Sequence, residues 1–185
     1  MPTARDSLLD AAFAALGDRP WTAIRMVEVA AAAGVSRQTL YNEFASKEGL
    51  ARALIRRETD AYLVGVERAL DLAERDGGDA GECFAAAVGW TLRTARRSPL
   101  VRSALVGSRT PDRPPLPDLV NALHTRTVQA LTHGFPQLRR EDIAWTSEAA
   151  IRLTLSYVIA PAPSDEDACL RVAQLVRNLL SWPLP

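Results

Sequence analysis

The sequence predicts an all-α protein, because apolar residues recur at helical spacing along almost the whole chain. No segment alternates polar and apolar residues over the length of a strand between turn residues. The 185 residues include 22 basic and 22 acidic side chains, and 48% of the chain is hydrophobic, a mix typical of a globular protein with its own core. We expect about nine helices, with a three-helix N-terminal domain followed by a larger helical domain.

Residues that start and stop helices delimit the first elements. One apolar stripe marks the first helix: Leu8, Leu9, Ala12, Phe13 and Leu16. Its end is expected at the Gly-Asp-Arg-Pro run 17–20. A short helix over 26–33 is expected to stop at Gly34, since a helix commonly ends on a left-handed residue. Ser36 is a candidate N-cap for a second short helix over 37–44.

A long helix is predicted from Lys47 to about Arg75, capped by Ser46 and broken by the Asp-Gly-Gly-Asp run 76–79. Later helices are expected over 82–97, 99–106, 117–133, 140–160 and 165–182. Ser98 and Ser164 are the expected caps of two of these. Segment 108–117 contains four prolines and is predicted to be a loop.

The last two predicted helices carry wide apolar faces near the end of a small chain, which indicates burial on two sides. Two interpretations fit this pattern. The helices are either ordinary core helices or half of a four-helix interface, formed when a two-fold axis pairs the same two helices of each chain. The candidate interface residues are Ile151, Leu155, Val158, Val172, Leu175, Val176 and Leu179.

Residues 25–49 predict a helix-turn-helix, with two short helices joined by a Gly-Val-Ser turn. Ala30 is small where crossing helices approach closely, and Leu40 and Phe44 are expected to anchor the second helix from beneath. This leaves a polar set near the surface: Arg37, Gln38, Thr39, Tyr41 and Asn42. A recognition helix uses such side chains on base edges in the major groove of DNA.

Three motifs, Ala33-Gly34-Val35-Ser36, Thr39-Leu40-Tyr41-Asn42-Glu43-Phe44 and Ser46-Lys47-Glu48, resemble the TetR family of bacterial transcriptional regulators. The resemblance spans roughly residues 5–57, and beyond residue 60 it is architectural only. It implies a homodimer that binds a near-palindromic double-stranded DNA operator, usually as a repressor, and a pocket for a small-molecule inducer. We therefore expect a DNA-binding domain over 1–47 and a ligand-binding and dimerisation domain over 48–185.

The resemblance also implies roles for individual residues. Arg37 and Gln38 match base-contacting positions, Thr39 and Tyr41 match phosphate-contacting positions, and Asn42 suits either target. Lys47 would hold a phosphate at the start of the long helix. With Arg25 and Ser36, the expected DNA-binding set is Arg25, Ser36, Arg37, Gln38, Thr39, Tyr41, Asn42 and Lys47.

The sequence departs from the family pattern at two helix starts. Ile24 and Arg25 stand where a capping Thr or Ser is common, so Arg25 is expected to contact phosphate directly while Thr22 caps the helix from further back. Gly49 replaces a common Glu, which removes a capping carboxylate and is expected to loosen the start of the long helix.

An effector pocket is expected between the central helices, although the same residues also suit an ordinary core. The candidates are Phe84, Val88, Trp90, Leu105, Leu123, His124 and Trp145. In a two-state switch, the long helix 47–75 would act as a lever and segment 108–117 as a gate.

Other function classes are disfavoured. Cys83 and Cys169 lack metal-ligand spacing and are interpreted as small buried thiols. His124 and His133 have no nucleophile or carboxylate pair at a recognisable spacing, so no catalytic residue, metal or cofactor is expected. No apolar run is long enough to span a membrane, and the N-terminus does not resemble a secretory signal, so we expect a cytoplasmic protein without a membrane partner. The alternative is a helical small-molecule or partner-binding protein whose DNA contacts are vestigial.

Overall fold

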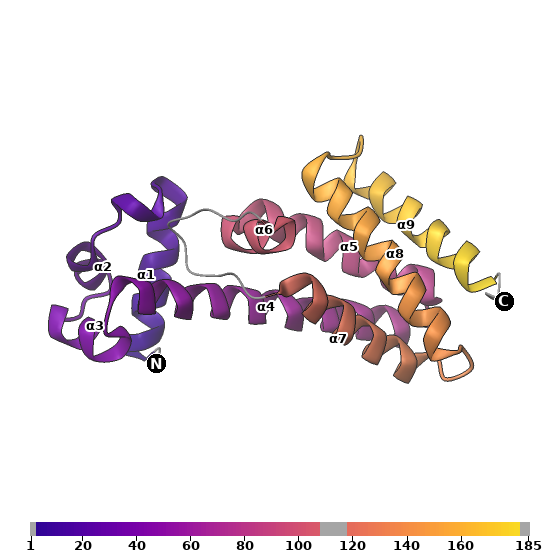
Figure 1. The fold of residues 1–185 in the computed structure, drawn as a ribbon, viewed down its shortest axis with the longest axis horizontal. Helices are drawn as coiled ribbons and strands as arrows, with labels where there is room; N and C mark the ends of the chain where they lie inside the picture. Colours follow the sequence, from indigo (N-terminus) through magenta and orange to yellow (C-terminus); the bar gives the residue numbers. More distant parts are fainter. Residues whose placement is uncertain (1–2, 108–117, 182–185) are drawn as a thin grey trace. The chain divides into compact units, whose positions relative to one another are not determined.

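The structure is a computed structural model that describes residues 3–107 and 118–181 (Figure 1). These ranges contain α-helices, one short 3-10 helix and no strand, which confirms the predicted all-α class. The elements are α1 (Ala4–Asp18), η1 (Trp21–Ala23), α2 (Met26–Ala32), α3 (Arg37–Phe44), α4 (Lys47–Arg75), α5 (Ala80–Arg97), α6 (Pro99–Val106), α7 (Leu119–Gly134), α8 (Arg140–Ile159) and α9 (Asp165–Ser181). The expected gate at 108–117 lies outside the described residues.

The first compact unit comprises α1, η1, α2, α3 and the first turns of α4. A capping box between Thr3 and Asp6 starts α1. The apolar faces of these helices meet in one core of buried residues: Leu8, Leu9, Ala12, Ile24, Val29, Ala30, Leu40, Phe44, Leu50 and Leu54. The helix-turn-helix therefore has its own hydrophobic support.

The boundary between the two compact units falls inside α4, between Arg57 and Glu58, and not at Lys47 where the domain division was expected. The reason is that the first turns of α4 belong to the core of the first unit. Leu50 and Leu54 are fully buried there, and Arg57 Nη1 donates to the Asp10 carboxylate on α1 at 2.6 Å.

In the second unit, α5 and α9 pack in antiparallel orientation and are joined by ion pairs near both ends. Arg177, late in α9, donates through Nε to Asp79, the N-cap of α5, at 2.7 Å. At the other end, Arg96 of α5 makes a bidentate pair with Asp165 in the first turn of α9. Between these pairs the helices approach closely, because a Cβ on Gly81 would lie 2.9 Å from the Ala173 carbonyl oxygen.

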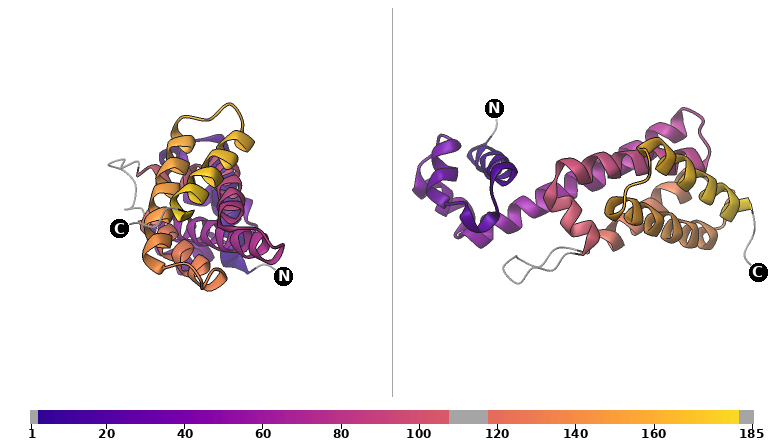
Figure 2. Two further views of the ribbon diagram at one scale, coloured as in Figure 1. Left: turned by 90° about the vertical axis from the view of Figure 1, so that its right-hand side faces the viewer. Right: turned by 90° about the horizontal axis from the view of Figure 1, so that it is seen from above.

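The remaining helices complete one core for the second unit, in which α7 packs on α8 and α8 on both α9 and α5. Both views of Figure 2 show α8 and α9, the orange-to-yellow helices, side by side. Tyr62 of α4 is buried, and its hydroxyl group lies 3.0 Å from the Thr91 hydroxyl of α5. Burial raises the pKa of Tyr62 far above its ordinary value, so the side chain acts as a neutral hydrogen-bonding group in this core.

Both cysteines are free thiols. Cys83 is buried as expected, and burial raises its pKa to about 11. Cys169 is only half-buried, which differs from the expectation, although partial burial raises its pKa as well. A raised pKa keeps both groups as unreactive thiols at neutral pH. In the described part of the chain, no helix is both long and apolar enough to cross a membrane.

Candidate functional site

The turn between α2 and α3 has the geometry that the sequence predicts. Gly34 adopts a left-handed backbone with φ of +68°, which a glycine accepts without strain. Ser36 caps α3, since its hydroxyl oxygen accepts from the Thr39 backbone N–H at 3.0 Å. Leu40 and Phe44 are buried beneath the helix, so the two hydrophobic anchors fix which face of α3 points outward.

The outward face of α3 carries the polar side chains expected there. Arg37, Gln38, Tyr41 and Asn42 are exposed, while Thr39 is half-buried with its hydroxyl 2.8 Å from the Ser36 hydroxyl. The Arg37 guanidinium lies over the Tyr41 ring, 5.4 Å from its centroid. This cation–π contact joins consecutive turns of α3 and holds the Arg37 guanidinium, with its several N–H donors, on the exposed face of the helix.

The C-terminal end of α3 is held by Arg5, a residue outside the motifs that predict the helix-turn-helix. Its guanidinium lies 4.6 Å from the centroid of the Phe44 ring. Arg5 Nη1 also donates to the Glu43 main-chain carbonyl oxygen at 3.2 Å and lies 3.4 Å from the Glu43 carboxylate. The beginning of α1 therefore supports the end of the recognition helix.

Lys47, the first residue of α4, is anchored within the first unit. Its ammonium group donates to the Thr22 carbonyl oxygen at 3.2 Å and lies 5.6 Å from the centroid of the Trp21 ring. One donated bond leaves the ammonium group with capacity for a phosphate oxygen, because Lys has three N–H donors. Trp21 also lies outside those motifs, since only the folded chain brings it to Lys47.

The start of α2 corrects one expectation. Arg25 occupies the N-cap position and no side chain caps this helix, so the interpretation of Thr22 as a cap is wrong. Thr22 lies in the 3-10 helix and uses its backbone carbonyl for Lys47. The Arg25 side chain is 79% exposed, and Glu28, 3.9 Å away, is its only ionic partner among the described residues.

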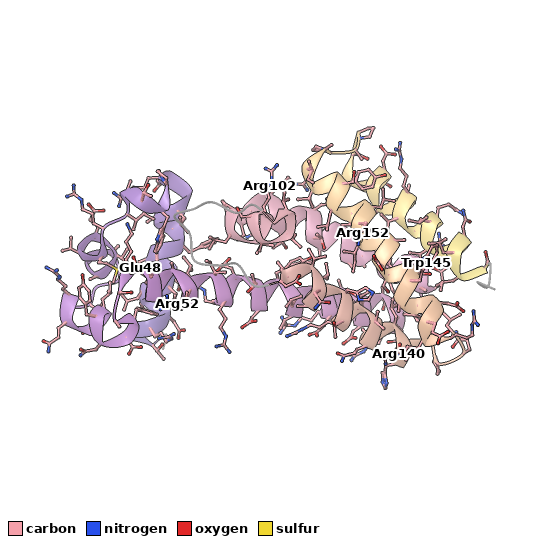
Figure 3. All side chains as sticks on the ribbon, in the orientation of Figure 1. Glu48, Arg52, Arg102, Arg140, Trp145 and Arg152 are labelled. Carbon is pink, nitrogen blue, oxygen red and sulfur yellow. The ribbon has the colours of Figure 1, made fainter. Side chains whose placement is uncertain are left out.

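The start of α4 is capped without a carboxylate at position 49. Ser46 accepts from the Gly49 N–H at 3.1 Å, as predicted for its N-cap role. The neighbouring Glu48 supplies a carboxylate, and its pKa is lowered because it accepts from its own backbone N–H and from the Ser46 hydroxyl. A Cβ at position 49 would lie 2.0 Å from the Phe44 carbonyl oxygen, so this glycine permits a close approach of α3 to α4. Figure 3 labels Glu48 and, one turn later, Arg52.

The expected pocket residues lie in several different environments. Phe84, Val88, Leu105 and Leu123 are buried in the core of the second unit. Trp90 packs on the α4 backbone, where its Nε1 donates to the Tyr62 carbonyl oxygen at 3.1 Å. Trp145 is 45% exposed on α8 (Figure 3). His124 alone among the candidates lines the groove between α7 and α8, which encloses about 350 Å³.

The expected interface residues also divide into two groups. Ile151, Val158, Val172 and Val176 are buried in the core of the second unit, and Ile151 also lines the groove between α7 and α8. The remainder, Leu155, Leu175 and Leu179, are half-buried. The largest exposed apolar side chains on these two helices are Ile159, Leu170 and Trp145, of which none was in the expected set.

Within the described ranges, no cluster of His, Cys, Asp and Glu residues has an arrangement that could hold a metal ion. The site consists instead of an exposed polar recognition helix on a small supporting core and a separate helical unit with a solvent-accessible groove.

Two family models match the chain in the same order as these units. Residues 8–54 match the model of bacterial regulatory proteins of the tetR family, and residues 79–178 match that of the C-terminal domain of the bacterial tetracyclin repressor. The first match contains α2 and α3 together with most of α1. The second covers α5 to α8 and most of α9.

Individual relatives agree with these matches. The chain is 35% identical over 177 residues to the HTH-type transcriptional regulator AlkX of Mycobacterium tuberculosis, covering 93% of this chain and 82% of the relative. The crystal structure of the TetR family repressor AlkX from Dietzia sp. has a TM-score of 0.65 at 22% identity, with 95% and 96% of the two chains covered. The structure of RolR with resorcinol has a TM-score of 0.58 at 23% identity, with 98% and 95% covered. These relatives are regulators and not enzymes, and the protein belongs to the TetR family of transcriptional regulators with a DNA-binding helix-turn-helix domain.

Proposed function

We propose that the protein is a repressor that binds a near-palindromic operator as a homodimer and is released by a small organic effector. The observation that carries the DNA-binding part is the division of α3 into two faces. Leu40 and Phe44 are buried, while Arg37, Gln38, Tyr41 and Asn42 are exposed together. A helix so divided presents hydrogen-bonding side chains to the major groove without loss of its own packing.

Each exposed group has a matching partner on DNA. The Arg37 fork suits the O6 and N7 atoms of guanine, and the Gln38 amide suits N6 and N7 of adenine, each contact being worth about 1–3 kcal/mol of discrimination. Ser36, Thr39, Tyr41, Arg25 and Lys47 are proposed to contact phosphates. Phosphate contacts set register and affinity, whereas base contacts set the sequence.

The proposed dimer uses the outer faces of α8 and α9. Ile159 is 59% exposed and Leu170 is 60% exposed, and a partner would remove this apolar surface from water. Leu175 and Leu179 are half-buried on α9. A two-fold axis through this face would pair identical surfaces and would present two recognition helices to the two half-sites of a palindrome.

The proposed effector binds in the second unit. In support, the related structure of RolR holds resorcinol, and the Dietzia AlkX repressor is implicated in biodegradation of n-alkanes. Both related proteins are thus associated with small organic compounds, which supports an effector of this kind. A ligand that favours one of two conformations changes the spacing of the recognition helices, with the continuous α4 as the proposed lever.

Selection of bound DNA from a random pool at fixed, near-physiological salt tests this function, because phosphate contacts inflate affinity at low ionic strength. The expected result is enrichment of an inverted repeat. The variant Arg37→Ala is expected to lose selectivity at one position of each half-site, whereas the matched control Arg140→Ala, at the exposed first residue of α8, retains it. A folded dimer that enriches no sequence would favour the alternative of a helical binding protein with vestigial DNA contacts.

A further inference from the structure

We propose that the groove between α7 and α8 binds a small organic amine, with the ammonium group held by carboxylate and imidazole acceptors and the apolar body held by aliphatic side chains. This inference names a chemical class for the proposed effector. Only the effect of the amine on DNA binding rests on the proposed function. Binding itself depends solely on the groove.

The groove has the size and the composition of a small-molecule site. Its volume of about 350 Å³ lies in the range of ligand pockets. Val120 contributes apolar surface from α7, and Ile151 and Leu155 contribute it from successive turns of α8. The polar lining residues are Asp118, Asn121, His124, Glu148 and Arg152. Figure 3 labels Arg152 on α8.

Both carboxylates in the lining have one oxygen available. Asp118 caps α7, and its Oδ1 accepts from the Asn121 backbone N–H at 3.0 Å. Glu148 uses a single oxygen, Oε1, for both bonds from Arg152, at 3.0 Å from Nε and 2.7 Å from Nη2. No described residue donates a hydrogen bond to Asp118 Oδ2 or Glu148 Oε2. Each carboxylate thus retains one oxygen that can accept a hydrogen bond from a ligand.

His124 adds a third acceptor. Its Nε2 lies 2.9 Å from the Ala144 carbonyl oxygen, which can only accept, so Nε2 carries the proton of the neutral ring. The lone pair is then on Nδ1, and no described residue donates to that atom. The bond to Ala144 on α8 also fixes the orientation of the imidazole ring at the groove.

The charge and the hydrogen bonding together select the class of ligand. Asp118 and Glu148 outnumber the single guanidinium of Arg152, so the lining has a negative balance that favours a cation and repels a carboxylate. A pure hydrocarbon would displace water from these acceptors and replace none of the lost hydrogen bonds. A protonated amine supplies N–H donors and positive charge, and its hydrocarbon part covers Val120, Ile151 and Leu155.

Three probes with the same ring test this selection. Isothermal titration calorimetry of the full chain with 2-phenylethylamine, 2-phenylethanol and phenylacetate, at one pH and ionic strength, compares a cation, a neutral donor and an anion. We expect the amine to bind about tenfold more tightly than the alcohol, and the carboxylate to bind most weakly. Equal affinities for the amine and the alcohol, or preference for the carboxylate, would overturn the proposal.

Variants locate the site. Glu148→Gln and Asp118→Asn keep the shape of the side chains and remove a negative charge, so each is expected to weaken amine binding about tenfold. Asp118→Asn should leave α7 intact, because Asn also caps helices well. Glu141→Gln makes the same change on the first turn of α8, outside the groove, and is the matched control. Asn121→Trp is expected to fill the mouth of the groove and abolish binding. Amine binding that survives Asn121→Trp would place the ligand elsewhere.

Two further readouts separate this proposal from the proposed function. If Asn121→Trp converts dimer to monomer in light scattering, a second copy of the chain occupies the groove and the amine site is refuted. DNA binding is measured independently on the selected operator, with and without the amine. Loss of amine binding with intact operator binding overturns only the groove proposal. Amine binding without any sequence-selective DNA binding overturns only the proposed function as a DNA-binding regulator.

Discussion

The indole ring of Trp90 lies directly on the backbone of α4 at Gly65. A Cβ on Gly65 would lie 2.1 Å from a carbon atom of that ring, and the indole Nε1 donates to the Tyr62 carbonyl oxygen at 3.1 Å. The absence of a side chain at Gly65 therefore lets α5 bond to the main chain of α4. This contact fixes the distance between the two helices in the second unit.

Gly65→Ala is expected to destabilise the second unit by about 1–3 kcal/mol, because the new methyl group forces the indole to move and overpacks the helix contact. Gly17→Ala on α1 is the matched control. It has no atom within 4 Å of the added Cβ and should stabilise the chain by up to about 1 kcal/mol through helix propensity. Urea unfolding measures both, and an unchanged midpoint for Gly65→Ala would contradict the packing.

The ion pairs between α5 and α9 predict an acid-sensitive unit. Hydrogen bonds from Arg177 and Arg96 lower the pKa values of Asp79 and Asp165, respectively, below their usual 3.8. A lowered pKa in the folded state means that the carboxylates contribute stability above about pH 4, and that this contribution is lost as the pH falls through the folded-state values.

Asp165→Asn should therefore flatten the dependence of unfolding free energy on pH between about 4 and 2, as measured by urea unfolding at a series of pH values. Asp71→Asn, an exposed change on α4 with no ion pair among the described residues, serves as the control. The ion-pair account is wrong if the two variants give the same pH profile.

Leu170→Glu is expected to dissociate the proposed dimer, because a partner covering this exposed position would take the new carboxylate out of water. The dimer dissociation constant should rise by at least about a hundredfold, measured by light scattering or sedimentation. Leu72→Glu on α4, at a side chain that is 62% exposed, controls for the added charge. If both variants stay dimeric, the interface lies on another surface.

Lys47→Ala should weaken operator binding for all sequences alike and lower the slope of log affinity against log salt by about one, as expected for the loss of one phosphate contact. Lys47→Arg keeps the charge and should retain the slope. Titrations of labelled operator at several salt concentrations give these values. A slope unchanged in Lys47→Ala would show that the ammonium group serves only its contacts with Thr22 and Trp21.

The helix boundaries were predictable because helix caps are local. The ranges 37–44, 47–75 and 99–106 match α3, α4 and α6, since Ser36, Ser46 and Ser98 cap them from the adjacent position in sequence. The recognition face followed from the same information, because the buried anchors Leu40 and Phe44 lie on the same helix as the polar residues.

Contacts between distant segments were not predictable in this way. Arg5 and Glu43 lie 38 residues apart, and helical spacing does not state which faces meet. The same limit explains why some of the expected interface residues lie in the chain's own core. The apolar stripe on α9 contains Val172, which is buried in the chain's own core, whereas Leu170 lies outside the stripe and is exposed. Burial in a folded chain decides between them.

The support of α3 from beneath has an evolutionary consequence. The position of the helix is determined by the buried Leu40 and Phe44 and by the contact of Arg5 with Phe44. Arg37 and Gln38 are exposed and do not contribute to that packing. Mutations at the two projecting positions can change which operator is recognised while the fold and its stability are preserved. A duplicated copy of this gene could thus acquire a new set of target promoters through very few substitutions.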